Sequence, residues 1–479
     1  METPIAYEWG ALLPEAILAV FALFALLFAS FARGRGGMLA RGICAFGIFL
    51  AVAVQISRMV CSAGGTSFGG TLECGSAFSC FVMLCGLLTL LIESRAEKKS
   101  GEFCALVLIC SASLAVFVRS QNLMLAFVAL ECATVCLYVL TAWQRSSSAS
   151  LEAAVRYLVV GGASGAIFLL GIAFLYGAGF SAGTDLLSVS NLGLAAENPL
   201  MWAGITLVGA AAFFKMAAFP FQFWAPDVYQ GAPTSVSAFL AVASKGAGAV
   251  FLVKICASLA SAAQDNPALN EKIVTVVGAV AALTILVGNL GGVTQTNAKR
   301  LLAFSGISNA GYLLVLAAAV AQTGISVFAE ATLAFYLLAY MFANYGIFCV
   351  LGGFAAERQS EVSLGDFRGM LAGNRRDALG LIANLASLAG IPPTAGFFGK
   401  VLIIMLAWSA ELYWLAAVLV AGSVVSIYYY FAWIRAAAEP QEKAGGADFA
   451  VSDLRASTLF ALSACSLLLG AFVVAARLL

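Results

Sequence analysis

The sequence predicts an all-α membrane protein with about 14 transmembrane helices, two inverted five-helix repeats and two discontinuous helices. Hydrophobic residues make up 62% of the 479 positions and charged residues only 10%, with a mean hydropathy of +0.99. Soluble domains carry about 25% charged residues, so this composition excludes an ordinary soluble protein. The apolar residues also gather in long runs, and a bilayer core needs about 20 of them in one helix.

Fourteen apolar stretches, separated by polar breaks, are long enough to cross a membrane as helices. The segment 65–75, GTSFGGTLECG, is the connection whose course the pattern leaves least certain. The stretches lie at 12–32, 42–60, 75–93, 103–119, 122–143, 152–178, 200–229, 233–260, 271–294, 298–321, 325–355, 377–409, 412–435 and 455–477.

The basic residues orient these spans. With the N-terminus outside, 17 Lys and Arg residues fall on inside connections and only 4 on outside ones, namely Arg58, Arg119, Lys272 and Arg477. Lys and Arg accumulate on the cytoplasmic side of membrane proteins, so the bias supports this threading. Both termini are therefore expected on the outer side.

Composition also excludes several function classes. A net charge of +1 without a basic run argues against nucleic-acid binding. The first eleven residues carry Glu2 and Glu8 but no Lys or Arg, which is not the pattern of a signal peptide. The 12 cysteines form no CxxC pair and are interpreted as small apolar helix residues, with a metal or redox role as the less favoured alternative.

Proline interrupts two unusually long spans at corresponding places. Pro220 breaks the seventh span, and Pro392 and Pro393 break the twelfth, because proline removes a backbone donor and clashes with the preceding turn. The two spans are five apart, so spans 4–8 and 9–13 overlay as units that enter the membrane from opposite sides. The expected organisation is 1–101, 102–262, 263–436 and 437–479: three helices, two half-channels and a last span. In transporters such broken helices mark the ion site; ordinary kinked helices are the alternative.

Four lysines, Lys215, Lys245, Lys254 and Lys400, interrupt apolar spans. A charge near the bilayer centre costs roughly 2.5–3.5 kcal/mol, and ionisable groups at that depth mark ion or proton paths. Lys215 precedes the first proline break, and Lys400 follows the second. Lys254 lies near the outer end of its span, where snorkelling to the interface explains it as well as a function does.

Glu131, in FVALECATVCLYVLTAW, is the only acid well inside an apolar run. Its expected partner is Lys215, from the same half of the chain. If Glu131 moves away or loses its charge, Lys215 should release its proton, so the pair is interpreted as a switch in a proton relay. A static buried ion pair is the alternative, although such pairs contribute little to stability.

The chain contains no histidine. A proton path must therefore use lysine, glutamate, hydroxyl groups and water. Ser305, Ser308 and Tyr312, together with Asn309, are candidates to hold that water in the tenth span. Polar packing between helices explains these residues equally well.

Three blocks of sequence carry a specific resemblance. They are FFKMAAFPFQFWAPDVYQGAPTSVSAFLAVASK (213–245), QTNAKRLLAFSGISNAGYLLV (295–315) and LAGIPPTAGFFGKV (388–401). They resemble the antiporter-like subunits of respiratory complex I, the proton-pumping NADH–quinone oxidoreductase, and within that family the subunit N type. The M type usually carries glutamate where this chain has Lys400.

The resemblance implies roles for the charged residues. It assigns Glu131 and Lys215 to the ion pair of the first half-channel, Lys245 to the central relay and Lys400 to the outlet side. Where this chain has Asn309 the family often has histidine, which puts a titrating role of that position in doubt.

The resemblance also implies a setting. NAD, FMN, iron–sulfur clusters and quinone belong to other subunits, and this chain has no cofactor or metal of its own. Expected partners are neighbouring antiporter-like and small core membrane subunits, in a bacterial inner membrane. Two alternatives with the same fold remain: a subunit of a multi-subunit cation/proton antiporter, and the membrane subunit of a related hydrogenase or deazaflavin-linked dehydrogenase. A solute transporter is disfavoured because the buried polar groups are mostly ionisable.

Overall fold

The structure is a computed structural model that describes residues 9–31, 36–61, 65–93, 100–182, 187–192, 198–262, 267–358, 362–440 and 453–478. Six of the basic residues expected inside lie outside the described residues, as do Glu2 and Glu8; the six are Arg33, Arg35, Arg95, Lys98, Lys99 and Lys443. The described chain is almost entirely helical. Its α-helices are α1 (Leu13–Phe31), α2 (Gly36–Cys61), α3 (Ala77–Ile92), α4 (Ser100–Arg119), α5 (Leu123–Thr141), α6 (Ser148–Ala182), α7 (Pro199–Met216), α8 (Trp224–Gly231), α9 (Thr234–Phe239), α10 (Lys245–Ala262), α11 (Pro267–Val293), α12 (Ala298–Thr323), α13 (Val327–Arg358), α14 (Met370–Gly373), α15 (Arg375–Ala389), α16 (Ala395–Ser409), α17 (Tyr413–Ala438) and α18 (Asp453–Leu478).

Eleven helical stretches of the described chain are long and apolar enough to cross a membrane, and three shorter apolar helices accompany them. The chain is thus a multi-pass membrane protein, as its composition predicts. The shorter helices, Ala77–Ile92, Ala395–Ser409 and Ser457–Gly470, fall within the predicted spans 75–93, 377–409 and 455–477. The total of fourteen spans, the two inverted repeats and the four-part domain division stay predictions.

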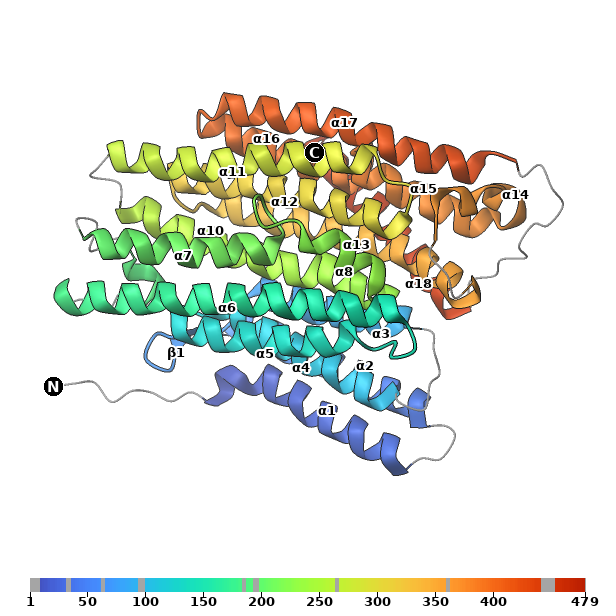
Figure 1. The fold of residues 1–479 in the computed structure, drawn as a ribbon, viewed down its shortest axis with the longest axis horizontal. Helices are drawn as coiled ribbons and strands as arrows, with labels where there is room; N and C mark the ends of the chain where they lie inside the picture. The colour runs from blue at the N-terminus through green and yellow to red at the C-terminus, as the bar shows by residue number, and fades with distance from the viewer. Residues whose placement is uncertain are drawn as a thin grey trace.

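The long helices lie side by side with similar axis directions, from α1 and α2 at one edge to α11 and α17 at the other (Figure 1). The spans Thr234–Ser261 and Ala298–Thr323 are almost wholly covered by other helices, whereas Trp9–Ser30 and Leu39–Cys61 are mostly uncovered. An apolar helix covered on all sides occupies a core rather than a lipid-facing position. The centre of the molecule is therefore built from α9, α10, α12 and α13.

Both predicted helix breaks are present. α7 ends at Met216 and α8 begins at Trp224, on either side of Pro220, while α15 ends at Ala389 and α16 begins at Ala395. Each broken helix closes on a residue in the left-handed region, Ala217 with φ 55° and Gly390 with φ 82°. Each of these residues donates its N–H to two carbonyls of the last turn, which is a common way to end a helix.

Two local features were not predicted. Leu240–Ser244 forms a π-helical turn directly before Lys245, and such turns occur often at functional sites. The uncertain segment 65–75 contains a short antiparallel hairpin, β1 (Thr66–Ser67) and β2 (Leu72–Glu73). The expectation of an all-α chain therefore needs one small correction. Turn residues with positive φ, including Phe68 and Gly70, close the hairpin. A hydropathy pattern identifies this segment only as a polar connection between helices.

Candidate functional site

Three of the four lysines are buried within the helical core. The exposed fraction is 3% for Lys215, 3% for Lys245 and 6% for Lys400. Each lies at a local irregularity of a helix: the end of α7, the π-turn before α10, and the first turns of α16 after the second break. Irregular backbone at membrane depth is tolerated only inside protein or along a cavity, so all three sites belong to the interior of the bundle.

Lys215 points toward α5. Its Nζ donates a hydrogen bond to Thr134 Oγ1 at 3.1 Å, and Thr134 in turn donates to the carbonyl of Leu130 at 2.6 Å. Glu131 lies three residues before Thr134 and so on the same face of α5. The Glu131 carboxylate and the Lys215 ammonium interact electrostatically, but among the described residues no ion pair within 4.0 Å joins them. Lys215 thus forms its hydrogen bond with Thr134, and the expected direct ion pair with Glu131 is not formed.

Glycines of α6 make room for the polar side chains of α5. A Cβ added at Gly165 would lie 2.5 Å from Oε1 of Glu131, and one added at Gly161 would overlap the hydroxyl of Tyr138. Larger residues at these positions would displace the carboxylate or the tyrosine. The small residues of α6 thus set where Glu131 lies.

Lys245 lies at the start of α10, between α8, α12 and α13. Its Nζ is buried and has no hydrogen-bond partner among the described residues. It lies 5.2 Å from the centroid of the Tyr229 ring, where a cation gains from the negative face of the ring. A Cβ at Gly306, on α12, would be 2.5 Å from Lys245 Nζ and 3.2 Å from the hydroxyl of Tyr340. Lys245 therefore faces α12 and α13, and its amine fits there because Gly306 has no side chain.

Hydroxyl and amide groups lie next to this point, although the Tyr340 hydroxyl itself has no hydrogen-bond partner among the described residues. The rings of Tyr340 and Tyr336 stack with centroids 6.4 Å apart, and Tyr336 donates to Oδ1 of Asn309 at 2.6 Å. Asn309 Nδ2 donates to the carbonyl of Ser305 at 2.8 Å, and the Ser305 hydroxyl lies 2.5 Å from that of Tyr430. Three spans, α12, α13 and α17, thus contribute to one polar line.

Lys400 lies at the far side of this line. Its Nζ donates to the carbonyls of Leu388 at 2.9 Å and Ala389 at 3.1 Å, which are the last two of α15. Carbonyls at a helix C-terminus lack helical partners and carry partial negative charge, so they suit an ammonium group. The Nζ also lies 5.3 Å from the centroid of the Tyr312 ring, which connects it to α12.

Comparison with known proteins gives a decisive match. The family described as NADH:quinone oxidoreductase/Mrp antiporter, TM matches residues 120–426, a range that contains Glu131, the buried lysines and both broken helices. The chain belongs to this family. The antiporter-like family that the sequence motifs resemble is thereby confirmed.

Relatives of this antiporter-like chain extend over most of its length. NADH-quinone oxidoreductase subunit N 1 of Opitutus terrae is 36% identical over 449 residues, which cover 90% of this chain and 87% of that protein. A chain of respiratory complex I from Thermus thermophilus is 29% identical with a TM-score of 0.78, and the match covers 95% and 96% of the two chains. A chain of an archaeal membrane-bound sulfane sulfur reductase, 22% identical with a TM-score of 0.82 and coverage of 97% and 94%, shares the fold.

Lys254 is set apart from the buried lysines of this antiporter-like chain. Its Nζ forms an ion pair with Glu73 Oε1 at 2.7 Å, and the two side chains are 16% and 25% exposed. Gln121 also donates to the Glu73 carboxylate. Glu73 belongs to the hairpin, so the pair ties β2 to α10. The sequence predicted either snorkelling or a relay role for Lys254, and neither prediction included an ion pair with Glu73.

A polar mouth lies where α6, α8 and α12 meet. Asp227 of α8 accepts hydrogen bonds from Arg156 of α6 and, at 2.6 Å, from Arg300 of α12. Arg300 also donates to Oε1 of Gln230 at 2.9 Å. A cavity of about 200 Å³ is lined by Glu152, Arg156, Asp227 and Gln230. The mouth joins the first half of the antiporter-like chain to the second half at its surface.

Sequence reasoning missed several polar residues of this site. Tyr336, Tyr340 and Tyr430 are buried and in contact with the line, yet only Ser305, Ser308, Asn309 and Tyr312 were named in advance. A signal was available, since Tyr336 and Tyr340 are four residues apart on one helix face inside an apolar run. Ser308 instead donates to the carbonyl of Ser305, as a helical serine commonly does.

The described residues include no group of three or more Cys, Asp or Glu side chains that could hold a metal ion. Each of the twelve cysteines is a free thiol, nine of them buried. The ionisable groups of this site are amines, a carboxylate and tyrosine hydroxyl groups, which can gain and lose protons. That the chain carries no cofactor stays a prediction.

Proposed function

We propose that this chain is the proton-translocating membrane subunit of an NADH–quinone oxidoreductase. It moves protons through a buried relay of glutamate, lysine, hydroxyl groups and water, and NADH oxidation and quinone reduction in other subunits drive the transfer. Membership of the antiporter family supports the proposal, as do relatives named as subunits of NADH–quinone oxidoreductases that align over 90% of this chain.

The observation that carries the relay is the environment of Lys245. An ammonium group buried to 97% without a hydrogen-bond acceptor is unfavourable, so a purely structural lysine at this position would lower stability. A leucine or methionine at this position would pack in the apolar interior and give a more stable fold than an unpaired ammonium group. The lysine is explained if it gains and loses a proton, because its neutral form needs little compensation inside the bundle.

The relay runs through both halves in sequence. In the first half Glu131 and Lys215 exchange a proton through water that fills the space between them, and Thr134 holds the Lys215 amine in place. Lys245 receives the proton from this half and passes it toward Tyr340 and the hydroxyl line of the second half. Asn309 cannot titrate, so its amide orients the hydroxyl of Tyr336 instead of carrying the proton.

Lys400 ends the relay of the second half. Its ammonium form is held by the carbonyls at the end of α15, so a proton arriving there meets a prepared acceptor. Lys254 is assigned to the ion pair with Glu73 and lies outside the relay. Breaks at Pro220 and at Pro392 and Pro393 provide the helix ends around which the relay is built.

The setting follows from this role. We infer fourteen membrane spans in the four-part division 1–101, 102–262, 263–436 and 437–479, with two inverted halves and both termini on the outer side of a bacterial inner membrane. Neighbouring antiporter-like and small core membrane subunits are the partners. NAD, FMN, iron–sulfur clusters and quinone belong to the rest of the complex.

The experiment uses the complex purified through a tag on this chain in mild detergent. The preparation should contain NADH:quinone reductase activity and, in liposomes, acidify the lumen when NADH is added. Lys245→Met keeps the apolar stem and removes the amine. A proton without a carrier at that depth meets a barrier of roughly 2.5–3.5 kcal/mol, so transfer through this chain should slow by about 10²-fold and the protons pumped per NADH should fall.

The matched control is Lys254→Met on the same helix, which should keep the pumping ratio of the unmodified complex. An unchanged ratio in Lys245→Met, with the complex fully assembled, would remove Lys245 from the path. Co-purification without any NADH:quinone activity would instead favour the cation/proton antiporter alternative.

A further inference from the structure

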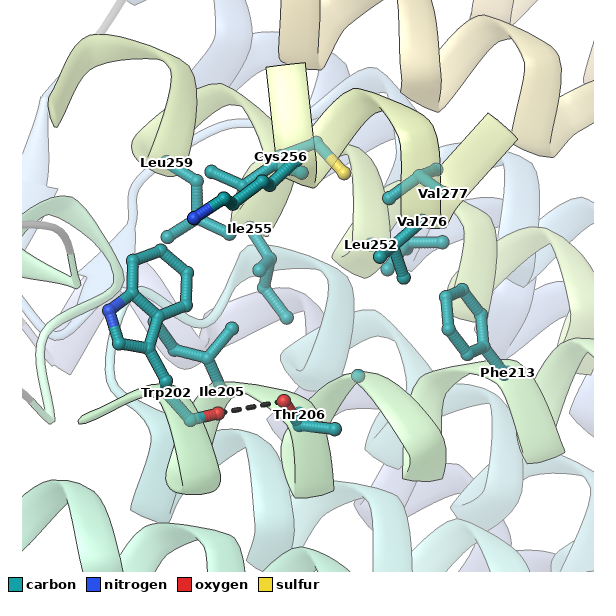
Figure 2. A pocket seen from close by; sticks show the side chains of 13 residues that line it. Trp202, Ile205, Thr206, Phe213, Leu252, Ile255, Cys256, Leu259, Val276 and Val277 are labelled. Carbon is teal, nitrogen blue, oxygen red and sulfur yellow. Dashed lines mark hydrogen bonds between the residues drawn. The ribbon is translucent and has the colours of Figure 1, made fainter. Parts of the chain in front are cut away.

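An apolar crevice opens between α7, α10 and α11, away from the buried lysines. Its volume is about 370 Å³. Trp202, Ile205 and Phe213 of α7 form one wall, Leu252, Ile255 and Leu259 of α10 form the floor, and Val276 and Val277 of α11 lie opposite (Figure 2). α10 is buried here, so the crevice exists because α7 and α11 do not meet over it.

The crevice has a dry interior and a polar end. The hydroxyl of Thr206 donates to the carbonyl of Trp202 at 2.7 Å, so the polar side chain on the α7 wall is satisfied within its own helix (Figure 2). Lys272, an exposed residue near the start of α11, lines the crevice together with Trp202 near the start of α7. Tryptophan and lysine both concentrate where a bilayer meets water.

We propose that this crevice binds one acyl chain of an anionic membrane phospholipid, with the phosphate headgroup against Lys272 and Trp202. No ion pair recorded among the described residues involves Lys272, so its charge is available to a ligand. Glu271 precedes it in α11 and, as an adjacent helical residue, points about 100° away around the helix axis. The charge at the crevice end therefore favours an anion.

The dimensions select a hydrocarbon chain over a helix of a partner. The α7 wall runs from Trp202 to Phe213, about 16 Å along the helix axis at 1.5 Å per residue. A cavity volume of about 370 Å³ over that length is far less than a partner helix about 10–12 Å across would fill. The volume suits a single acyl chain, which is much thinner than a helix.

Gly209 supplies a way to fill the crevice without disturbing the fold. It lines the crevice, and a Cβ built on it meets no atom within 4 Å. Gly209→Phe should therefore occupy the space meant for the acyl chain. Gly177 of α6 also has open space around its Cβ and is not among the residues that line the crevice, so Gly177→Phe is the matched control.

The test uses the assembled complex in lipid nanodiscs that contain phosphatidylglycerol with a photoactivatable acyl chain. After illumination, mass spectrometry should find the label on peptides of α7 and α10 that line the crevice. Gly209→Phe should remove most of this label, and Gly177→Phe should keep it. Equal labelling in the two variants would overturn the proposal, as would a quinone tail or a partner subunit crosslinked to these peptides.

A second variant tests the headgroup without changing the interior. Lys272→Gln removes one charge near the membrane surface, which is worth about 1 kcal/mol toward an anionic lipid, or about fivefold in binding. Labelling by the phosphatidylglycerol probe should fall by that factor relative to a phosphatidylcholine probe of the same chain. An unchanged ratio would contradict the proposed headgroup contact.

Discussion

The ion pair between Glu15 and Arg119 is a sharp target for a stability test. Arg119, expected from the sequence on an outer connection, is fully buried and donates to Glu15 Oε1 at 2.5 Å, to the carbonyl of Ala11 at 2.6 Å and to that of Glu73 at 2.9 Å. It thereby joins the start of α1, the end of α4 and the hairpin. Glu15→Gln would leave the guanidinium charge buried without a counter-charge.

The magnitude follows from that burial. Removing one partner of a buried ion pair costs about 3–5 kcal/mol, because the remaining charge is desolvated and uncompensated. Cys74 reports the loss, since its thiol is 2% exposed and packs with Ala11 and Leu72 under the hairpin. Labelling of a buried thiol requires local opening. At about 1.4 kcal/mol per factor of ten, Glu15→Gln should speed Cys74 labelling by two to three orders of magnitude.

The assay measures the rate of thiol modification in the assembled complex, by mass spectrometry of the peptide that carries Cys74. Glu15→Gln combined with Arg119→Met should label more slowly than Glu15→Gln alone, because no unpaired charge is left. Glu152→Gln, at an exposed ion pair with side chains 52% and 63% exposed, should change the rate little. A single variant that labels no faster than the double variant would refute the reasoning.

Two further outcomes are expected. Gly306→Leu would place a Cβ 2.5 Å from Lys245 Nζ, and because that atom ends a flexible side chain the fold should persist. The protons pumped per NADH should nonetheless fall as in Lys245→Met. Unchanged pumping would contradict the position assigned to Lys245. Beyond α17, a hydrogen bond from Arg435 lowers the pKa of Glu439 below its ordinary value of 4.5. The ion pair between Arg435 and Glu439 therefore stabilises the end of α17 at neutral pH and is lost as the pH falls through the lowered pKa. The amide of Gly369 donates to the carbonyl of Glu439, so its hydrogen exchange, corrected for intrinsic rates, should rise only in acid. In Glu439→Gln the exchange should be raised already at pH 7.

The many apolar helices of this membrane protein and its two helix breaks were predictable from the sequence. Apolar runs of sufficient length and the steric effect of Pro220, Pro392 and Pro393 are local properties of the chain. The burial of Lys215, Lys245 and Lys400 was predictable for the same reason, since each lies well inside an apolar run.

The contacts of the site were less accessible. Lys254 and Glu73 are 181 residues apart, and nothing in either neighbourhood indicates the other. The hydrogen bond from Lys215 to the Thr134 hydroxyl depends on the rotation of α5 against α7, which a nearly uniform apolar surface leaves undetermined. The tyrosine line was missed because a tyrosine in an apolar run reads as core, although a buried hydroxyl nearly always has a partner.

The charges around the buried lysines bear on the order of proton transfer. Glu131 is the acidic group nearest in sequence to the Lys215 partner Thr134, while the described residues form no ion pair within 4.0 Å with Lys245 or Lys400. Three protonated lysines would leave an excess of positive charge in a medium where like charges repel strongly. If the relay operates as proposed, one carboxylate supports about one protonated lysine at a time. A proton that enters at Lys215 then favours release of the proton held by Lys245 or Lys400. The tyrosines between Lys245 and Lys400 are neutral, so this release places no further charge between the two lysines.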